Sequence, residues 1–382
     1  MPRNISRKPR LAIISDTSMY RREKAFIFEP VLREISYFSD LFNNIIWLGF
    51  SRSIPPPSNA KKINGNNIKL LVVRPCGGNT YLKKLGIILF IPYYVFKIIR
   101  LVKKSDVIHT RGPSIPAMLT ILISFFYPNK KYWHKYAGNW QLGSKALSYR
   151  FQKWLLMKKI PGKVIVSKKN NLDPSHILSW LNPCLTEKEI MINKEFGIKK
   201  KFSGKLTFCF VGRLEKSKGL SVLLEAIDNL DKITWIDKLH CVGEIIDKNI
   251  ISKYSSSNKN LVVYHGILDR LELNKIYADS HFIILPSESE GFPKVLAEAS
   301  SFGCIPIVPP IQSILFQINE EKQNGIVLKN TTPQVIKETI ENLHYRRNEF
   351  PELSKKAMWD VERFSYEKYN QCIVDYILSD TE

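Results

Sequence analysis

Short apolar segments alternate with amphipathic segments along almost the whole chain, and this alternation constrains the fold more than any other feature of the sequence. In the first half, the short runs rich in Ile, Leu, Val and Trp are predicted strands, at residues 11–15, 44–50, 68–73, 105–110, 131–136 and 163–167. The longer segments between them are predicted helices, at residues 30–38, 85–102 and 116–127. Strands that alternate with helices form a parallel sheet with helices on both faces.

The second half of the chain repeats this rhythm after a polar, Lys-rich join between Pro183 and Lys205. Its predicted strands are residues 205–213, 238–243, 261–266, 281–287 and 305–310, and its predicted helices are 221–230, 294–303 and 333–348. We therefore expect an α/β protein with two Rossmann-like domains, whose parallel sheets face each other across a cleft. Ligands of such sheets bind at the carboxyl ends of the strands. No Gly-x-Gly-x-x-Gly follows the first strand, which argues against a simple dinucleotide-dependent dehydrogenase.

The excess positive charge is confined to the first half. The 382 residues carry a formal net charge of +22. Residues 1–185 contain 31 Lys and Arg against 7 Asp and Glu, whereas residues 186–382 contain 26 against 28. This asymmetry predicts an anionic partner for the first half, such as a nucleic acid, an acidic lipid surface or a phosphorylated substrate.

The segment Tyr81–Lys104 bears on the choice between these partners. It is apolar in the middle, contains Tyr93 and Tyr94, and has Lys and Arg at both ends. This pattern is typical of a helix in a membrane interface, although a core helix with solvated ends has the same composition. Its apolar run, residues 85–96, is too short to span a bilayer. The charge asymmetry favours a peripheral membrane contact. Nucleic acid ranks lower, because no nucleic-acid-binding module is recognisable.

The sequence shows few features of a secreted protein. The apolar run at residues 11–15 is shorter than that of a signal peptide. None of the six cysteines forms a Cys-x-x-Cys pair, and scattered single cysteines fit a reducing compartment. We therefore expect the protein in the cytoplasm, in peripheral contact with the inner face of the cell membrane.

The first motif that indicates chemistry is CFVGRLEKSKGLSVLLEAI, which begins at Cys209. A predicted strand ends at Gly212, and the loop after it carries Arg213 and Lys218. Gly219 then opens a helix. Cations at the carboxyl end of a strand, beside a helix N-terminus, form an anion site. Arg213 can bind a phosphate through two hydrogen bonds, and Lys218 acts as a point charge. The alternative is a surface turn with solvated charges.

The second motif is LPSESEGFPKVLAEASSFGCIPIV, residues 285–308. Glu290 lies in the loop after a predicted strand, and Glu298 follows eight positions later, inside the next helix. One carboxylate can accept hydrogen bonds from sugar hydroxyls and the other from ribose hydroxyls, while the helix N-terminus meets a diphosphate between them. Gly291 lets the backbone approach a ligand closely, and Pro293 suits the first turn of a helix. The alternative is an acidic loop followed by an ordinary helical glutamate.

Taken in this order, the two motifs resemble those of the family 4 retaining glycosyltransferases of GT-B fold, the glycosyltransferase group 1 type. Glu290 and Glu298 match the Glu-x7-Glu pattern of that family, and the likeness is dense from Lys205 to Val308. The resemblance implies an acceptor-binding domain at residues 1–185 and a nucleotide-sugar-binding domain at 186–358. It also implies a C-terminal helix, within residues 359–382, that crosses back to the first domain.

The resemblance implies roles for single residues as well. Arg213 and Lys218 would neutralise the donor diphosphate, and Glu298 would bind the ribose. The implied donor-binding residues are Arg213, Lys218, Glu290, Gly291, Phe292, Lys294 and Glu298. The implied catalytic residues are Glu290, His109, Arg213 and Lys218.

The first half of the chain resembles the family more loosely. SDVIHTRGPSIPAMLTILISFF is similar to a strand and helix of the family, so that His109 would stand at a strand end facing the cleft; a buried core histidine is the alternative. The residues implied in acceptor binding are Arg111, Lys135, Tyr136 and Gly138. Three departures leave the acceptor open. The loop after the first strand lacks the family's Gly-Gly pair, Arg111 replaces a second histidine, and the residues at 309–312 are Pro-Pro-Ile-Gln where the family often has a Gly-Gly turn.

These observations predict a retaining transfer of a sugar from a nucleotide-diphosphate donor to a cell-surface polysaccharide, lipopolysaccharide or lipid-linked glycan. No Asp-x-Asp pair follows a strand, so we expect neither a metal nor another cofactor. Two alternatives remain. One is a non-catalytic subunit that binds a nucleotide sugar. The other is a basic nucleic-acid-binding protein, which would leave both motifs without a purpose.

Overall fold

The computed structural model describes residues 8–21, 25–57, 59–63, 65, 67–75, 81–138, 140, 146–230, 234–254, 261–319 and 321–379, with backbone alone for residue 21 and residues 81–88. The chain divides into two compact units. Unit 1 comprises residues 1–181 and 369–382, and unit 2 comprises residues 182–368. The chain therefore leaves unit 1 four residues before the predicted boundary at 185 and returns at Tyr369, inside a helix, rather than at residue 359.

Unit 1 is built on a sheet that has nine strands in the described residues. They are β1 (Arg10–Arg21), β2 (Ala25–Phe28), β3 (Asn44–Arg52), β4 (Ala60–Lys62), β5 (Ile68–Val73), β6 (Val107–Gly112), β7 (Lys131–Tyr136), β8 (Lys163–Val166) and β9 (Ile177–Ser179). The parallel strands lie in the order β5-β3-β1-β6-β7-β8-β9. The short strands β2 and β4 extend the carboxyl end of β1 in antiparallel pairing. The strand order reverses between β1 and β6, as in a Rossmann fold.

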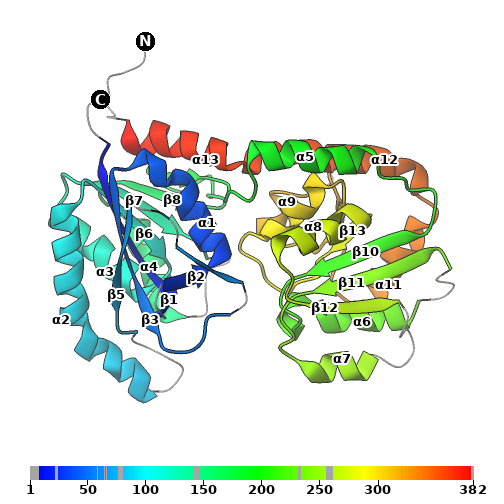
Figure 1. Cartoon of the computed structure of the whole chain (residues 1–382), viewed down its shortest axis with the longest axis horizontal. Helices are drawn as coiled ribbons and strands as arrows, with labels where there is room; N and C mark the ends of the chain where they lie inside the picture. The colour runs from blue at the N-terminus through cyan, green and yellow to red at the C-terminus, as the bar shows by residue number, and fades with distance from the viewer. Residues whose placement is uncertain are drawn as a thin grey trace, which may run out of the picture. The chain divides into compact units, whose positions relative to one another are not determined.

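The helices of unit 1 cover both faces of this sheet, which Figure 1 shows with α2 and α1 on opposite sides. They are α1 (Glu29–Phe38), η1 (Ser39–Leu41), α2 (Tyr81–Lys104), α3 (Ile115–Ser124), α4 (Leu147–Leu156), α13 (Tyr366–Ile373) and the π-helical turn η5 (Val374–Leu378). Successive side chains of β1 point to opposite faces of the sheet, and each face is covered by its own layer of helices. Ile13 packs with α1 and α13, whereas the neighbouring Ala12 and Ile14 pack with α2 and α3. Tyr369 and Ile373 of α13 belong to the first of these cores.

Unit 2 contains a parallel sheet, in the order β12-β11-β10-β13-β14-β15 among the described strands. These are β10 (Leu206–Val211), β11 (Ile236–Val242), β12 (Val262–Gly266), β13 (Phe282–Ile284), β14 (Ile305–Val308) and β15 (Ile326–Val327). β10 is buried along its whole length, which explains its continuous apolar sequence. The order again reverses in the middle, between β10 and β13, where a Rossmann-type sheet binds its ligand.

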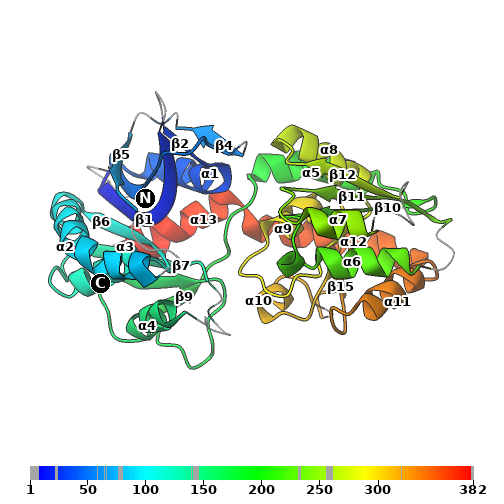
Figure 2. The ribbon, with the colours of Figure 1, turned by 90° about the horizontal axis from the view of Figure 1, so that it is seen from below.

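Helices cover the sheet of unit 2 on both sides (Figure 2). They are α5 (Glu187–Ile198), η2 (Lys216–Lys218), α6 (Leu220–Asp228), α7 (Lys248–Tyr254), α8 (Arg270–Asp279), α9 (Lys294–Ser301), α10 (Gln312–Leu315), α11 (Pro333–Leu343), η3 (Arg347–Glu349), α12 (Phe350–Asp360) and η4 (Val361–Phe364). α11 packs on α6, while α5, α8, α9 and α12 pack together. Figure 1 shows the second group above the strands and the first below.

The α/β class and the two parallel sheets are therefore confirmed. A strand is present at each range predicted from the sequence. Among the described α-helices of unit 2, α5, α7, α8, α10 and α12 were not predicted. Two of them have capping boxes that are visible in the sequence. Thr186 and Glu189 cap α5, within the segment read as a polar join, and Asp269 and Glu272 cap α8. None of the described helices is both long and apolar enough to cross a membrane.

Candidate functional site

Two loops meet where the strand order of unit 2 reverses. The first follows β10 and runs from Gly212 to Gly219, and the second follows β13 and runs from Leu285 to Pro293. Because β10 and β13 are parallel neighbours, their carboxyl ends lie at the same edge of the sheet. Both motifs singled out in the sequence are therefore brought to one place.

Backbone contacts hold these two loops against each other. The amide of Glu288 donates to the carbonyl of Ser217 at 3.1 Å. Gly219 has a φ of +77°, and a Cβ at this position would overlap the carbonyl oxygen of Pro286. Only glycine allows both the left-handed backbone and this close approach. The glycine that opens α6 thus permits the two loops to pack directly together.

An ion pair joins the side chains of the two loops. Lys218 Nζ lies 2.7 Å from Glu290 Oε1. The Glu290 side chain is 9% exposed and that of Lys218 is 23% exposed. Because water screens this pair only weakly, its two charges attract each other strongly. The hydrogen bond between them is charge-assisted and therefore short. Lys218 and Glu290 are the two predicted site residues that the structure brings into direct contact.

Glu290 is held at its side chain and at its backbone. Ser287 Oγ donates to the same carboxylate oxygen at 2.7 Å. Ser313 Oγ, from α10, donates to the carbonyl oxygen of Glu290 at 2.5 Å. Neither serine was predicted as a site residue. Ser287 could have been noticed, since it lies three residues before Glu290 in the same loop, whereas Ser313 is 23 residues away.

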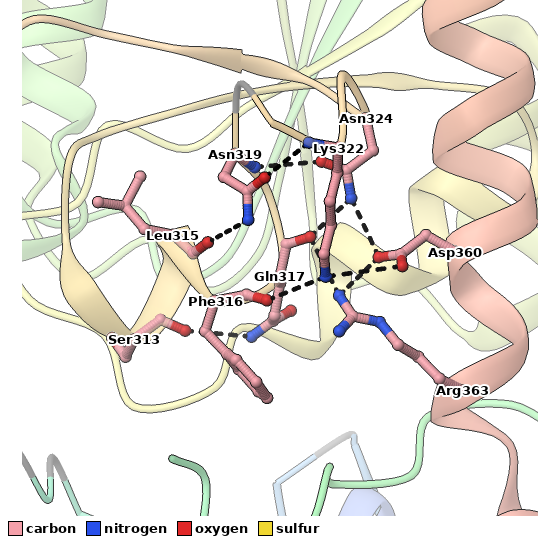
Figure 3. Close-up of polar contacts among 9 residues, drawn as sticks. All are labelled: Ser313, Leu315, Phe316, Gln317, Asn319, Lys322, Asn324, Asp360 and Arg363. Atoms are coloured by element: carbon pink, nitrogen blue, oxygen red, sulfur yellow. Dashed lines mark hydrogen bonds and ion pairs between the residues drawn. The ribbon is translucent and has the colours of Figure 1, made fainter. Parts of the chain in front are cut away.

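Figure 3 shows how the segment that carries Ser313 is held. Asn324 Nδ2 donates to the carbonyl of Gln317 at 2.6 Å and to Asp360 Oδ2 at 3.0 Å. Arg363 Nη2 donates to the same carboxylate oxygen at 2.6 Å and to the carbonyl of Gln317 at 3.1 Å. This network fixes the chain after β14 to the end of α12. Where the family that the motifs resemble often has a Gly-Gly turn, this chain has Pro-Pro-Ile-Gln at residues 309–312. The segment after these residues is held by hydrogen bonds to Asp360 and Arg363.

Glu298 lies inside α9, and its side chain is 15% exposed. Arg270 Nη1, from the first turn of α8, lies 3.5 Å from Glu298 Oε1. The hydroxyl of Tyr277 lies 3.5 Å from Glu298 Oε2. Arg270 also approaches Glu189 of α5, at 3.6 Å. Arg270 was not predicted as a site residue, because it follows the capping residue of a helix that was not predicted either.

Arg213 has a different environment from Lys218. Its Nη2 lies 2.8 Å from Glu215 Oε1, two residues further along the loop, and its side chain is 59% exposed. Arg213 and Glu298 thus have separate partners, and no contact joins them among the described residues. Of the predicted phosphate-binding cations, Lys218 is held in place, whereas Arg213 is on the surface of the loop.

The remaining predicted donor-binding residues follow Glu290 directly. Gly291 and Phe292 are half-buried, and the ring of Phe292 packs edge-on against Phe364 at 5.5 Å between centroids. α9 begins at Lys294, with Pro293 in the N-cap position rather than in the first turn. The first amides of α9 therefore point towards the loop that carries Glu290.

His109 requires a correction. It is the third residue of β6, and its side chain is completely buried in unit 1, stacked on Trp133 at 3.8 Å between ring centroids. Its Nδ1 donates to the Trp133 carbonyl at 3.0 Å. Burial holds the pKa of His109 well below its usual value. His109 was expected at a strand end facing the cleft, with a buried core histidine as the alternative. The structure shows the alternative, a buried histidine inside the strand.

Two of the four predicted acceptor-binding residues, Arg111 and Lys135, form an ion cluster with the buried Glu34. Glu34 of α1 lies 2.6 Å from Lys135 Nζ and 2.8 Å from Arg111 Nη1, and its side chain is 3% exposed. Tyr136 is 2% exposed and packs on Trp140. Lys135 and Tyr136 therefore do not reach the surface, and their predicted contact with an acceptor is corrected. Gly138, beside the Tyr136 ring, is half-buried.

In the described part of the chain, no three His, Cys, Asp or Glu side chains gather as a metal site would require. The expectation that the reaction needs no metal stays a prediction.

Comparisons with known proteins agree with this geometry. Residues 191–357 match the family model of the glycosyl transferases group 1. An uncharacterized 41.2 kDa protein in the cps region of Klebsiella pneumoniae is 30% identical over 122 residues, which are 32% of this chain and 31% of that protein. The chain thus spans about a third of this relative.

Solved structures resemble the whole chain. Anabaena Alr3699/HepE in complex with UDP and glucose has a TM-score of 0.65 at 13% identity, over 96% of this chain and 98% of the other. WaaG, a glycosyltransferase involved in lipopolysaccharide biosynthesis, has a TM-score of 0.64 at 14% identity, over 96% and 100%. At these identities the likeness establishes the fold.

Two Rossmann-ordered parallel sheets, with phosphate-compatible loops at the strand reversal of the second, define a protein of the GT-B class. Its second unit also matches the family model of the glycosyl transferases group 1, over residues 191–357, which is the family that the two sequence motifs resemble. The fold class and the resemblance expected from the sequence are therefore confirmed.

Proposed function

We propose that the protein transfers a sugar from a nucleoside diphosphate donor to a glycan acceptor, with retention of the anomeric configuration and without a metal ion. The proposal depends mainly on the ion pair between Lys218 and Glu290, which joins the two loops at the strand reversal of unit 2. The family match supports it, as does the UDP bound by Anabaena HepE, a protein of the same fold.

In this proposal the leaving group is stabilised by positive charge. Negative charge builds on the diphosphate as its bond to the anomeric carbon breaks. Lys218, Arg213 and the first amides of α9 stabilise that charge, in a site where little water screens it. Glu290, with its carboxylate held by Ser287, accepts hydrogen bonds from hydroxyls of the transferred sugar.

The acceptor hydroxyl attacks from the side that the diphosphate leaves, which retains the configuration. Its proton passes to the departing phosphate oxygen. Glu298 binds the ribose hydroxyls, with Arg270 and Tyr277 orienting its carboxylate. No described side chain is required as a nucleophile in this route.

Lys218→Ala and Glu290→Gln test the donor site. Each change should lower kcat at least about 100-fold. Lys218→Ala removes a stabilising group from the developing charge, and Glu290→Gln removes the carboxylate that holds Lys218 and the sugar hydroxyls. Lys216→Ala and Glu288→Gln are matched controls, since both residues are exposed and lie in the same two loops. The measurement is release of UDP from UDP-sugars, together with the melting temperature of each variant. Wild-type rates in Lys218→Ala or Glu290→Gln would refute the proposal.

The acceptor in this proposal is a lipid-linked glycan, a lipopolysaccharide or another cell-surface polysaccharide, reached at the inner face of the cell membrane. The cps region of the Klebsiella relative and the role of WaaG in lipopolysaccharide biosynthesis support this choice. The surface of unit 1 supports it independently.

Three neighbouring helices of unit 1 expose apolar side chains on one side of the sheet. α3 contacts both α2 and α4. Their exposed large apolar residues, here called the aromatic face, are Leu89, Tyr93, Phe96, Leu122, Phe125, Phe126, Leu147, Phe151 and Trp154. On α4, Leu147, Phe151 and Trp154 recur at helical spacing, so that they form one stripe. Exposed apolar side chains on neighbouring helices are typical of an interaction site when they form one surface.

The charge around this face selects an anionic lipid surface as its partner. From residue 81 to residue 172 the chain has 18 Lys and Arg and a single acidic residue, Asp106. Several of these cations lie on aromatic rings of the face, as Lys97 does on Tyr93 and Lys158 on Trp154. Aromatic residues mixed with Lys and Arg match the headgroup region of an acidic membrane.

Binding to vesicles tests the membrane contact. Phe151→Ala and Trp154→Ala should each weaken partition into acidic vesicles about tenfold, because each removes a large apolar side chain from the interface. Tyr345→Ala is the matched control, since Tyr345 is an exposed aromatic residue of unit 2. Equal partition of wild type and the α4 variants, or no binding at low salt, would contradict the membrane contact.

A further inference from the structure

A hollow lies at the carboxyl edge of the sheet of unit 1, away from the residues discussed so far. It has a volume of about 480 Å³ and is formed where β3 and β5 end. Phe50 and Val73 are the last paired residues of these two strands. Arg74 directly follows Val73, and Arg52 is the last residue of β3, two positions after Phe50. Both arginines line the hollow, together with Ser51 and Ser53. This is the edge at which parallel α/β sheets bind their ligands.

The two arginines are not neutralised by acidic side chains. Neither Arg52 nor Arg74 forms an ion pair within 4 Å in the part of the chain that is described, and both are exposed. Asp16 is exposed and acts on Arg52 through its charge, but the two side chains form no ion pair within 4 Å. Two guanidinium groups without an ion-pair partner among the described residues create a local positive potential at one hollow. Nine of their ten N–H groups remain as donors for an anion, because Arg52 Nε already donates to Ser18.

Both arginines are fixed in place by neighbours that leave most of their donors available. Arg52 Nε donates to Ser18 Oγ at 3.0 Å. The guanidinium of Arg74 lies 5.8 Å from the centre of the Phe90 ring. The backbone carbonyl of Arg74 accepts a hydrogen bond from the Tyr94 hydroxyl at 2.5 Å. A side chain that is oriented in advance loses less entropy when it binds a ligand.

The contacts of Arg74 connect the hollow to the aromatic face. Phe90 and Tyr94 belong to α2, as do the exposed Leu89 and Tyr93 of that face. A ligand in the hollow therefore lies beside the helix proposed to meet the membrane. The wall of the hollow is partly apolar, with Ile54, Val73 and Pro75.

The paired N–H groups of one guanidinium match two oxygens of a phosphate or of a carboxylate. Two guanidinium groups at one hollow favour a phosphate, which offers more oxygens and a higher negative charge. The serine hydroxyls supply further donors, and the apolar wall suits the carbon atoms of an ester. We propose that Arg52 and Arg74 form a binding site for a phosphate or diphosphate ester, through which the acceptor is held by its phosphate. The second part of this statement rests on the proposed transferase function, whereas the phosphate site does not.

The phosphate can come from a membrane lipid or from a water-soluble ester. The first test is titration of the full-length protein with inorganic pyrophosphate, in the presence of saturating UDP to occupy unit 2. Arg52→Gln and Arg74→Gln should each weaken pyrophosphate binding at least about tenfold, as expected for loss of a charge-assisted, two-pronged contact. Lys69→Gln is the matched control, because Lys69 is an exposed cation of β5 that does not line the hollow.

The second test identifies the source of the phosphate. Vesicles of phosphatidylcholine with phosphatidic acid are compared with vesicles of equal charge that contain phosphatidylserine. If the wild type prefers phosphatidic acid and Arg52→Gln loses that preference, the ligand is a lipid phosphate. If the variants lose pyrophosphate binding only, the ligand is a soluble phosphate ester. Both results support the site.

Unchanged pyrophosphate binding in the Arg52→Gln, Arg74→Gln double variant would overturn the proposal. Arg52→Lys guards against misfolding, since it keeps the charge and should bind with intermediate affinity. Failure of the transferase proposal is recognised separately. In that case UDP does not raise the melting temperature of the wild type, while the difference between wild type and the arginine variants remains measurable.

Discussion

Glu34 is the residue whose role was least visible in the sequence. Its carboxylate binds Arg111 and Lys135, which are 77 and 101 residues away, and approaches the hydroxyl of Tyr369 at 3.4 Å. The sequence places Arg111 and Lys135 near strand ends, where binding residues often lie, and offers no sign of their partner. The structure shows that these cations compensate a buried acid that ties α1, β6, β7 and α13 together.

Replacing Glu34 tests this interpretation. Glu34→Gln keeps the shape of the side chain but leaves two buried cations without their counter-charge. The free energy of unfolding should fall by about 3–5 kcal/mol, the usual result of removing one partner from a buried ion pair. Asp40→Asn, at an exposed acid of η1, serves as the control and should change it by less than about 0.5 kcal/mol. Denaturant unfolding measures both, and equal stability of the two variants would contradict a buried-charge role.

At the scale of elements, the segment after β14 supports the candidate site from outside it. α10 begins at Gln312, and Ser313 in its first turn binds the backbone of Glu290. The side chains of Asn324, Asp360 and Arg363 hold the rest of the segment (Figure 3). The position of Glu290 thus depends on an element that makes no expected contact with the donor.

Ser313→Ala should reduce activity more than stability. The change leaves the buried carbonyl of Glu290 without its donor, which costs about 1–3 kcal/mol at that loop. We therefore expect kcat/KM to fall about tenfold or more. Ser354→Ala is the matched control, because Ser354 Oγ makes a similar buried bond to the Gly303 carbonyl at 2.8 Å. Activity that falls equally in both variants would indicate a general loss of stability rather than a role in positioning Glu290.

For the molecule as a whole, buried histidines make stability depend on pH in both units. Burial is the main cause that lowers the pKa of five histidines, His109, His134, His240, His265 and His281. His134 shows the reason clearly. Its Nδ1 accepts from the Thr110 hydroxyl at 2.9 Å, its Nε2 donates to the Pro161 carbonyl, and its pKa is lowered to about 4.

The sign of the pH effect follows from proton uptake. An unfolded histidine has a pKa of about 6.5, so between that value and the folded pKa the unfolded state binds more protons. The contribution of these histidines to the free energy of unfolding is therefore complete above about pH 6.5 and is lost as the pH falls towards 4. His134 alone should contribute about 3 kcal/mol to this loss. Denaturant unfolding at a series of pH values measures it. His134→Gln should flatten the curve, and an unchanged slope would contradict the assignment.

The sequence by itself determined the α/β class, the two Rossmann-like halves, the resemblance to the group 1 glycosyltransferases and the loops that carry Lys218 and Glu290. Periodicity, turn residues and short motifs are local properties, and they depend on neighbours only a few positions apart. They also place Arg213 and Glu298 on the correct elements, although not with their partners.

Tertiary structure alone decided which side chains meet. The order of the strands places β10 beside β13 and thereby joins Lys218 to Glu290 across 72 residues. The same kind of long-range packing buries His109 and Lys135, pairs Glu298 with Arg270, and sets Arg52 beside Arg74 at one hollow. The physical reason is that such contacts depend on strand order and on the packing of both faces of a sheet. No local pattern of residues encodes these properties.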